Sequence, residues 1–288
     1  MLVAELVKAS VIRLMAAGIE SPEVEVSLLL GFCLGKSRSE LFLAGGAEVE
    51  PESEQRFLSL LARRLRREPS AYLLGEREFW SLSFRVTPDV LIPRPETEYL
   101  IEQVLARWPR QEGGALLDLC CGSGVIAVVL ARELGAQVVA VDISAAALAV
   151  ARENARRHGV ADQIQFVQAD LLSCFALHRQ FALVVSNPPY VSRLSLEQEL
   201  EPEVADHEPH LALDGGADGL DLIRAIARDL PSILAPRGHL FMEFGADQGA
   251  AVRALFILEH EWERRGGQVG IFQDYSGHDR VLHLQAQE

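Results

Sequence analysis

Residues 116–124, with the sequence LLDLCCGSG, join a short apolar run to a glycine-rich turn. The run 116–120 is followed directly by turn residues, which indicates a buried β-strand. Gly122 and Gly124 carry no Cβ atom, so the turn lets a ligand approach the backbone closely. A buried strand that runs through such a turn into a helix favours an α/β fold, in which ligands bind beyond the carboxyl ends of parallel strands.

Four more strand candidates lie downstream, and helical or loop stretches separate them. They are residues 138–141, 164–167, 181–186 and 239–244. Two further segments, 268–272 and 280–284, are joined by turn residues and predict an antiparallel pair that closes the sheet. This alternation from residue 96 onward argues for a parallel sheet covered by helices.

The chain before residue 79 has a different pattern. Between residues 2 and 67, apolar positions recur at intervals of three and four, which predicts a small bundle of short helices. Ser21 and Pro22 are interpreted as the cap residue and the first residue of the second helix. The arginines at 63, 64, 66 and 67 are interpreted as a solvated helix face rather than as a contact for RNA.

Alternation of apolar and polar residues from 79 to 86 predicts a hairpin-like linker after the bundle. We therefore expect three parts along the chain. They are a helical bundle at 1–78, the linker at 79–95 and the sheet domain at 96–288.

The composition restricts the classes of partner. The chain has 288 residues, 49% of them hydrophobic, and its 41 acidic and 27 basic side chains give a net charge of -14. A long-range positive field is absent, so we expect no direct binding of nucleic acid. No apolar run approaches the roughly 18 residues of a membrane span, and the first ten residues have no basic region ahead of an apolar core. We expect a cytoplasmic monomer that is not bound to membranes.

The four cysteines, at 33, 120, 121 and 174, have no recurrent CxxC spacing. They are predicted to be reduced thiols, and no metal site is expected.

Acidic residues end the two strands that follow the glycine-rich turn. Asp142, eighteen residues beyond Gly124, is placed to accept two hydrogen bonds from a ribose diol. Asp170 ends the third strand and is placed to accept from an adenine amine. The three strand ends are predicted to converge on one adenosine-like ligand. The alternative for Asp142 is a helix cap alone, and the lack of a GxGxxG pattern disfavours a nicotinamide or flavin cofactor.

The fourth strand stops abruptly at Asn187-Pro188-Pro189-Tyr190. The prolines donate no hydrogen bonds and have a fixed φ, so the Pro188 carbonyl can be held facing the cleft. Together with the Asn187 side chain it offers two acceptors for an NH₂ group, and Tyr190 offers a flat face for a planar substrate. The alternative is a strand-terminating loop without chemistry.

These motifs resemble a known family. The NPPY turn is similar to the active-site motif of S-adenosylmethionine-dependent methyltransferases that act on planar NH₂ groups. Further stretches resemble the bacterial release factor N5-glutamine methyltransferases, namely residues 71–79, 90–98, 208–221 and 277–282. The resemblance implies a Rossmann-like seven-stranded methyltransferase sheet, mostly parallel with one antiparallel strand, and a small N-terminal helical bundle. It also implies S-adenosylmethionine as cofactor and S-adenosylhomocysteine as product.

Carried over to this chain, the resemblance implies roles for individual residues. It places the cofactor against Cys120, Cys121, Gly122, Ser123, Gly124, Asp142, Asp170, Leu171 and Asn187. It places the target glutamine against Asn187, Pro188, Pro189 and Tyr190, of which Asn187, Pro188 and Tyr190 form the catalytic group. The chain departs from the family at Cys120 and Cys121, where Gly-Thr is usual. A side chain at position 120 is expected to need a turn that avoids positive φ.

The implied reaction is methyl transfer to the side-chain nitrogen of the glutamine in the Gly-Gly-Gln loop of class-one release factors, recognised as protein partners by the bundle. Three alternatives stay open: a glutamine methyltransferase of a ribosomal protein, a nucleic-acid amino-methyltransferase that holds a flipped base, and a noncatalytic cofactor-binding or scaffold protein. The acidic balance disfavours the second alternative. The presence of both acceptors and the aromatic residue disfavours the third.

Overall fold

The computed structural model of the protein describes residues 1–108, 114–175, 180–259, 262 and 266–287. The chain divides into two compact units. The bundle unit comprises Met1–Glu76 and Glu201–His207, and the sheet unit comprises Arg77–Leu200 and Glu208–Glu288. The chain therefore enters the bundle unit twice, the second time with a short segment that follows the NPPY turn.

The bundle unit consists of short helices, as the apolar spacing predicted. They are α1 (Val3–Ala16), α2 (Pro22–Leu34), α3 (Arg38–Leu43), α4 (Pro51–Arg64), α5 (Ser70–Leu74) and α10 (Pro202–His207). Helix α2 begins at Pro22, which confirms the predicted start, but Ser21 has a φ of 48° and its side chain makes no capping hydrogen bond. The interpretation of Ser21 as a side-chain cap is therefore wrong, because a left-handed backbone at this residue does not direct the hydroxyl to the first turn.

Helix α2 carries apolar side chains on two opposite sides. Val26, Leu29 and Leu30 are buried in the core of the unit. On the opposite side, Val24, Leu28 and Phe32 are spaced four residues apart and are 48%, 46% and 38% exposed. Residues four apart lie on one side of a helix, so these three side chains form a continuous stripe, which we call the α2 apolar face.

A buried guanidinium holds α10 to the other helices of the bundle unit. Arg64 is 6% exposed, and it donates to Glu25 at 2.9 Å and to Glu203 of α10 at 3.0 Å. Arg67 donates to the same Glu203 oxygen at 3.0 Å. The interpretation of this arginine cluster as a solvated face is therefore wrong for Arg64, because the carboxylates that cover it come from distant parts of the chain.

The sheet unit opens with a hairpin of β1 (Glu76–Phe79) and β2 (Leu82–Arg85), followed by α6 (Pro95–Arg107). The seven strands of the large sheet are β3 (Ala115–Leu119), β4 (Val138–Asp142), β5 (Ile164–Gln168), β6 (Phe181–Ser186), β7 (Leu234–Glu243), β8 (Gln268–Gln273) and β9 (Asp279–Gln285). Their order is β5-β4-β3-β6-β7-β9-β8. Strand β9 runs antiparallel to both of its neighbours, whereas β5, β4, β3, β6 and β7 pair in parallel. The predicted sheet with one antiparallel strand is confirmed.

Strand β7 begins five residues earlier than predicted. Its register shifts between the pairs Phe181↔Leu234 and Leu183↔His239, so β7 carries extra residues there. Pro236 and Arg237, the latter with a φ of 60°, lie in this bulge. Proline is tolerated where ladder pairing is interrupted, which the alternation of the strand did not reveal.

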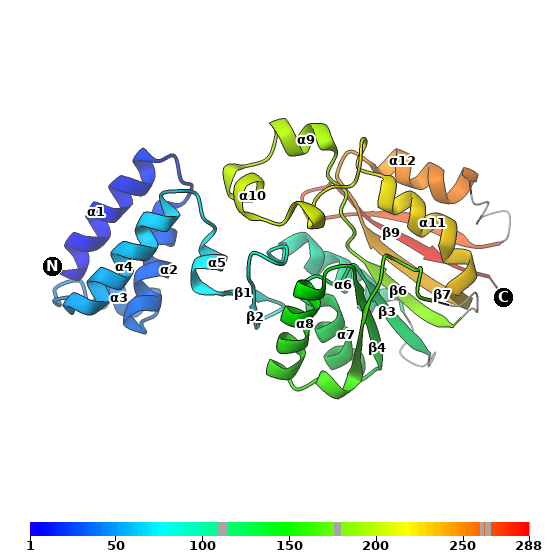
Figure 1. The fold of residues 1–288 in the computed structure, drawn as a ribbon, viewed down its shortest axis with the longest axis horizontal. Helices are drawn as coiled ribbons and strands as arrows, with labels where there is room; N and C mark the ends of the chain where they lie inside the picture. The colour runs from blue at the N-terminus through cyan, green and yellow to red at the C-terminus, as the bar shows by residue number, and fades with distance from the viewer. Residues whose placement is uncertain (109–113, 176–179, 260–261, 263–265, 288) are drawn as a thin grey trace. The chain divides into compact units, whose positions relative to one another are not determined.

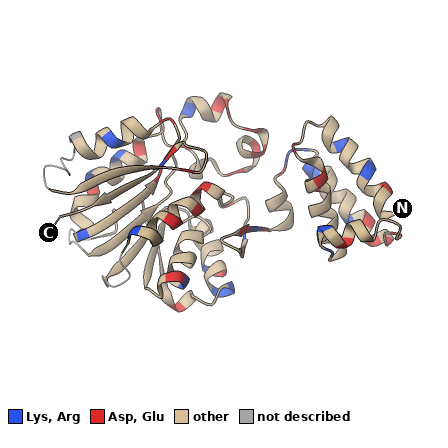
Figure 2. Ribbon diagram, turned by 180° about the vertical axis from the view of Figure 1, so that it is seen from behind, with Lys and Arg blue, Asp and Glu red and all other residues tan. Residues whose placement is uncertain are grey.

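Helices cover both faces of the sheet (Figure 1). On one face lie α6, α7 (Val125–Leu134) and α8 (Ala145–Arg157), and on the other lie α11 (Asp221–Ile233), α12 (Gly249–Ala254) and η3 (Leu255–Glu259). The shorter elements are η1 (Ala161–Gln163), α9 (Arg193–Gln198) and η2 (His210–Ala212). Figure 2 shows charged residues mainly on helices and loops, with the strands largely tan.

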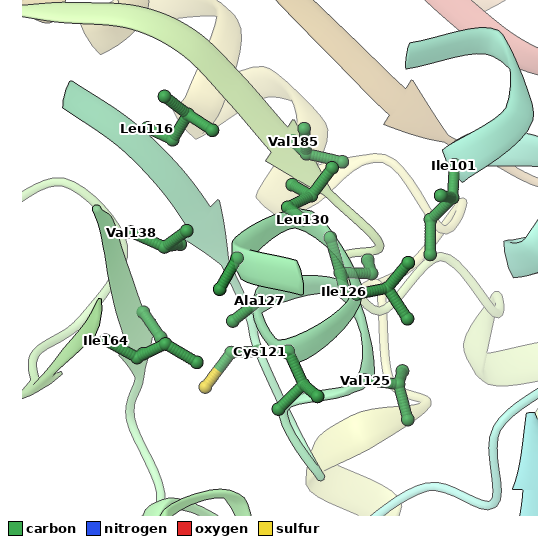
Figure 3. Close-up of a cluster of buried hydrophobic side chains, with 14 of the residues drawn as sticks. Ile101, Leu116, Cys121, Val125, Ile126, Ala127, Leu130, Val138, Ile164 and Val185 are labelled. Carbon is green, nitrogen blue, oxygen red and sulfur yellow. The ribbon is translucent and has the colours of Figure 1, made fainter. Parts of the chain in front are cut away.

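Alternate side chains of the buried strands pack into two hydrophobic cores, one on each face of the sheet. Leu116 packs into the core under α6, α7 and α8, which Figure 3 shows around Ile126 and Leu130, whereas Leu117 packs into the core under α11. Successive side chains of a strand point to opposite faces, so a strand that buries side chains on both faces must be covered on both sides. Because β5, β4, β3 and β6 are neighbours in that order and pair in parallel, their carboxyl ends lie at one rim of the sheet.

Candidate cofactor and substrate site

A cavity of about 400 Å³ lies at the carboxyl ends of the parallel strands. Its size is within the range of small-molecule sites. One wall comes from the turns after β3, β4 and β5, a second from residues 88–97, and a third from the NPPY turn and residues 209–222.

Three residues of the glycine-rich turn after β3 have a left-handed backbone. Cys120, Gly122 and Gly124 have φ values of 63°, 51° and 79°. The expectation that Cys120 avoids positive φ is wrong, and its backbone is held there by neighbours: the N–H of Cys121 donates to the Val141 carbonyl at 2.9 Å and that of Gly124 to the Cys121 carbonyl at 2.7 Å. A left-handed residue with a side chain costs about 1–3 kcal/mol.

The two glycines of this turn have different roles. A Cβ atom on Gly124 would lie 2.9 Å from the Cβ atom of Ala151, so glycine lets the start of α7 pack closely on α8. A Cβ atom on Gly122 would meet no described atom within 4 Å. Gly122 lines the cavity, so its backbone is open to a ligand on that side, as a cofactor that contacts the turn would require.

Asp142, at the end of β4, connects this turn to the start of α8. One carboxylate oxygen accepts the N–H of Gly122 at 2.8 Å, and the other accepts the N–H of Ser144 at 2.8 Å. Burial raises the pKa of Asp142, and these backbone hydrogen bonds oppose that rise. Each oxygen keeps a lone pair for a further donor. Asp142 therefore accepts a cap-like hydrogen bond from Ser144 and also lines the cavity.

Two residues that the sequence did not single out position the turn. Asp118 is fully buried in β3 and accepts the N–H of Ala127 in the first turn of α7 at 2.9 Å. Asn154 of α8 donates to the carbonyls of Ser123 at 2.9 Å and Arg85 at 3.0 Å. Burial raises the pKa of Asp118 to about 7. The lone Asp within the apolar strand β3 is a local signal for Asp118, whereas Asn154 lies among charged residues of α8 and has no such signal.

The NPPY turn begins where β6 ends beside β3. Ser186 is buried, and its hydroxyl donates to the Leu119 carbonyl at 2.8 Å. Pro188 and Pro189 are buried, and Asn187 and Pro189 line the cavity. After the turn, the Tyr190 carbonyl accepts from the Gln248 side chain at 2.9 Å, which fixes the chain where it leaves the sheet.

A buried network of hydrogen bonds lies behind Asn187. Its Nδ2 atom donates to the Thr97 hydroxyl at 3.0 Å, and that hydroxyl donates to Glu243 at 2.8 Å. The Tyr190 hydroxyl donates to the other Glu243 oxygen at 3.1 Å. Burial raises the pKa of Glu243, although both hydroxyl donors and the charge of Arg280 act against that rise.

The wall formed by residues 88–97 is fastened by Glu208. This carboxylate is buried and accepts the N–H of Ile92 at 3.1 Å and the guanidinium of Arg94 at 2.6 Å. The stretches 90–98 and 208–221, which the sequence offered only as family resemblance, are thus joined at the cavity.

The structure brings most of the predicted site residues together. Those that line the cavity are Cys120, Gly122, Ser123, Asp142, Asp170, Leu171, Asn187 and Pro189. Those outside its lining are Cys121, which is buried in the core, Gly124, Pro188 and Tyr190. Thr97 and Arg94 line the cavity but were not among the predicted residues. Within the described ranges, no group of three or more His, Cys, Asp and Glu side chains could hold a metal ion, and no described helix has the length and apolarity for a membrane span.

Known proteins match both units of the chain. A family model described as "Methyltransferase small domain" matches residues 96–242, and one described as "PrmC N-terminal domain" matches residues 5–75. A release factor glutamine methyltransferase from Geobacter sulfurreducens is 42% identical over 268 residues, which cover 92% of this chain and 90% of that protein. One from Cereibacter sphaeroides is 42% identical over 281 residues, which cover 97% and 96%.

Among solved structures, a methyltransferase from Pyrococcus furiosus matches with a TM-score of 0.52 and 14% identity, over 79% of this chain and 98% of that chain. That likeness concerns the fold, and it confirms the predicted methyltransferase sheet. Because the two bacterial relatives align over nearly their whole length with this chain, it belongs to the family of release factor glutamine methyltransferases.

Proposed function

We propose that this protein transfers a methyl group from S-adenosylmethionine to the side-chain nitrogen of the glutamine in the Gly-Gly-Gln loop of class-one release factors. The observation that supports this most strongly is that Asn187 lines the same cavity as Asp142 and Gly122. Asn187, an acceptor for an NH₂ group, and the residues suited to bind adenosine thus line one cavity. We propose the release factor as the substrate because both relatives are named release factor glutamine methyltransferase.

The cofactor, when bound, supplies a methyl group on a positively charged sulfur. We propose that Asp142 accepts the ribose hydroxyls and that Asp170 and Leu171 contact the adenine. The turn formed by Cys120, Cys121, Gly122, Ser123 and Gly124 would bind through its backbone, and Asn187 would lie beside the transferred methyl group. The open side of Gly122 and the backbone-held carboxylate of Asp142 support this assignment.

The target glutamine would be bound by Asn187, Pro188, Pro189 and Tyr190. An amide nitrogen is a poor nucleophile because its lone pair is delocalised into the carbonyl. We propose that its two N–H groups donate to the Asn187 side chain and the Pro188 carbonyl, which orients the nitrogen and favours positive charge developing on it. Tyr190 is proposed to support the planar group, although its hydroxyl is directed to Glu243.

Orientation is expected to contribute more than any single hydrogen bond. Positioning of two bound reactants is worth roughly 7–11 kcal/mol, whereas one hydrogen bond contributes about 1 kcal/mol net. As the N–CH₃ bond forms and the S–CH₃ bond breaks, the nitrogen gains a positive charge. It then loses a proton to water, since an N-protonated amide is strongly acidic, so no general base is required in the transition state.

We propose that the bundle at residues 1–78 recognises the release factor. The α2 apolar face supports this, because exposed apolar side chains that share one side of a helix are typical of protein-binding surfaces. The hairpin-like linker at 79–95 would join the bundle to the methyltransferase domain at 96–288. A cytoplasmic location, the absence of direct nucleic-acid binding and a monomeric state stay predictions.

The substrate can be tested with radiolabelled S-adenosylmethionine. The protein would be incubated separately with a release factor, the same factor with its loop glutamine changed to alanine, a ribosomal protein and DNA. We expect label on the intact release factor alone. Label on the ribosomal protein or DNA instead would overturn the proposal in favour of the corresponding alternative, and no label on any of them would favour a noncatalytic role.

A further inference from the structure

We infer that Thr97 and Glu243 are positioning residues that fix the direction of the Asn187 amide, so that its oxygen faces the cavity and selects a substrate group that donates N–H. This role deepens the proposed function and rests on it for its kinetic consequences. The direction of the Asn187 amide is a property of the protein alone and can be tested without a substrate.

The topology of the sheet places Glu243 behind the NPPY turn. Strands β6 and β7 are parallel neighbours, and Ser186 is in register with Met242. Asn187, the first residue after β6, and Glu243, the last residue of β7, therefore lie at the same level. Thr97 lies in the first turn of α6, and it fills the space between them with a hydroxyl that contacts both side chains.

The direction of this chain of hydrogen bonds follows from the chemistry of its members. We take Glu243 as ionised, the form that the two hydroxyl donors and the charge of Arg280 favour. An ionised carboxylate can only accept hydrogen bonds, whereas a hydroxyl has one proton to donate. Each oxygen of Glu243 accepts one hydroxyl, from Thr97 at 2.8 Å and from Tyr190 at 3.1 Å. The Thr97 proton is thereby committed to Glu243, and the Thr97 oxygen can only accept from Asn187.

Asn187 must consequently present its NH₂ group to Thr97, at 3.0 Å, and its oxygen to the cavity that it lines. The oxygen and nitrogen of an amide side chain are nearly equal in size, so packing alone discriminates poorly between the two orientations. Glu243 and Thr97 remove this ambiguity because the reversed amide would place two acceptors against each other in a buried site. The cavity is thus given an acceptor, which fits the NH₂ of glutamine and rejects a carboxylate.

The composition of the chain provides a direct test of the geometry. Asn154 and Asn187 are the two asparagines in the 288 residues, so protein labelled with side-chain [¹⁵N]asparagine gives two NH₂ groups in an NMR spectrum. Asn154 is buried and donates to the Ser123 and Arg85 carbonyls. It serves as an internal control in the same molecule.

We expect the Thr97→Val variant to move the Asn187 NH₂ signals and to speed their hydrogen exchange, while the Asn154 signals stay in place. Thr97→Ser keeps the hydroxyl and should restore the wild-type spectrum. If Thr97→Val is too unstable to study, Glu243→Gln provides the second variant, because glutamine can donate to Thr97 and release the fixed direction. Unchanged Asn187 signals in the variant studied would overturn the inference.

Kinetics with a release factor then test the consequence. Thr97→Val should lower kcat on the order of 10- to 100-fold with an unchanged cofactor Kd, and Thr97→Ser should recover most of the activity. The variant should also narrow the preference of the site for the Gly-Gly-Gln factor over a Gly-Gly-Glu factor in a binding assay. An unaltered kcat and preference in Thr97→Val would overturn the selective role. Absence of activity in the wild-type protein would instead refute the proposed function, and the NMR test of the amide direction would still stand.

Discussion

One carboxylate oxygen of Asp142 accepts the backbone N–H of Gly122 at 2.8 Å, so the end of β4 and the turn after β3 form one structural unit at the cavity. The second oxygen accepts the N–H of Ser144 at 2.8 Å, at the start of α8. Asp142 thus shapes the proposed cofactor site in addition to lining it.

Replacing Asp142 with alanine is expected to act mainly on cofactor affinity. A hydrogen bond to a charged group is worth about 1.5–3 kcal/mol, which corresponds to a roughly 10- to 100-fold weaker Kd. Calorimetric titration with S-adenosylhomocysteine measures this change. Asp162→Ala, at an exposed acid of η1, is the matched control, and an unchanged Kd in Asp142→Ala would remove Asp142 from the ribose site.

Replacing Asn187 with alanine is expected to have the reverse effect. The change removes an acceptor that faces the proposed substrate and leaves the backbone-held carboxylate of Asp142 in place, so kcat should fall by about 100- to 1000-fold while cofactor affinity changes little. Single-turnover kinetics and calorimetry on the same preparation separate the two quantities. Normal single-turnover chemistry together with lost cofactor affinity would show that Asn187 serves the cofactor and not the methyl acceptor.

Asp118 predicts a pH dependence of stability. Burial raises its pKa from 3.8 to about 7 in the folded state, so the folded protein holds a proton that the unfolded chain has lost between these values. The resulting stabilisation is complete below pH 3.8 and is lost as pH rises to about 7. Its full size is about 4 kcal/mol, because each pH unit corresponds to about 1.4 kcal/mol.

The Asp118→Asn variant has no such proton to lose. Thermal unfolding of the cofactor-free protein between pH 5 and 8 should therefore show the Tm of the variant improving relative to the wild type as pH rises. Asp162→Asn is the control at an exposed position. A Tm difference between Asp118→Asn and wild type that stays constant over this range would contradict the raised pKa.

The α2 apolar face predicts a selective effect on the protein substrate. Leu28→Glu places a charge in the middle of this face and should raise the KM for the release factor by roughly 10- to 100-fold, the equivalent of one buried leucine side chain. Cofactor affinity and Tm should stay close to the wild-type values, because Leu28 is already 46% exposed.

Leu58→Glu provides the matched control for that surface. Arg56 of α4 lies over the Phe32 ring at 4.8 Å, and a residue two positions further along the helix points to the other side. Leu58 is itself 36% exposed. Equal effects of the two variants on KM would argue against a specific surface on α2.

The carboxyl-end rim of the sheet could be predicted from local patterns. Alternation and apolar runs identified all seven strands, and the glycines, Asp142 and the two prolines marked the ends of β3, β4 and β6. These signals are local, because strand periodicity, backbone freedom at glycine and the missing N–H of proline act within a few residues.

The partners of buried polar groups depended on the tertiary structure. Thr97 meets Asn187 across 90 positions and Glu208 meets Ile92 across 116, and nothing local at either member indicates its partner. The positive φ of Cys120 was likewise unpredictable, since hydrogen bonds around the turn outweigh the steric cost of its side chain. Local sequence determined where strands end and where acceptors are available. Sheet order and packing determined which buried groups those acceptors meet, because a buried hydrogen bond must be completed by whatever the fold brings into contact.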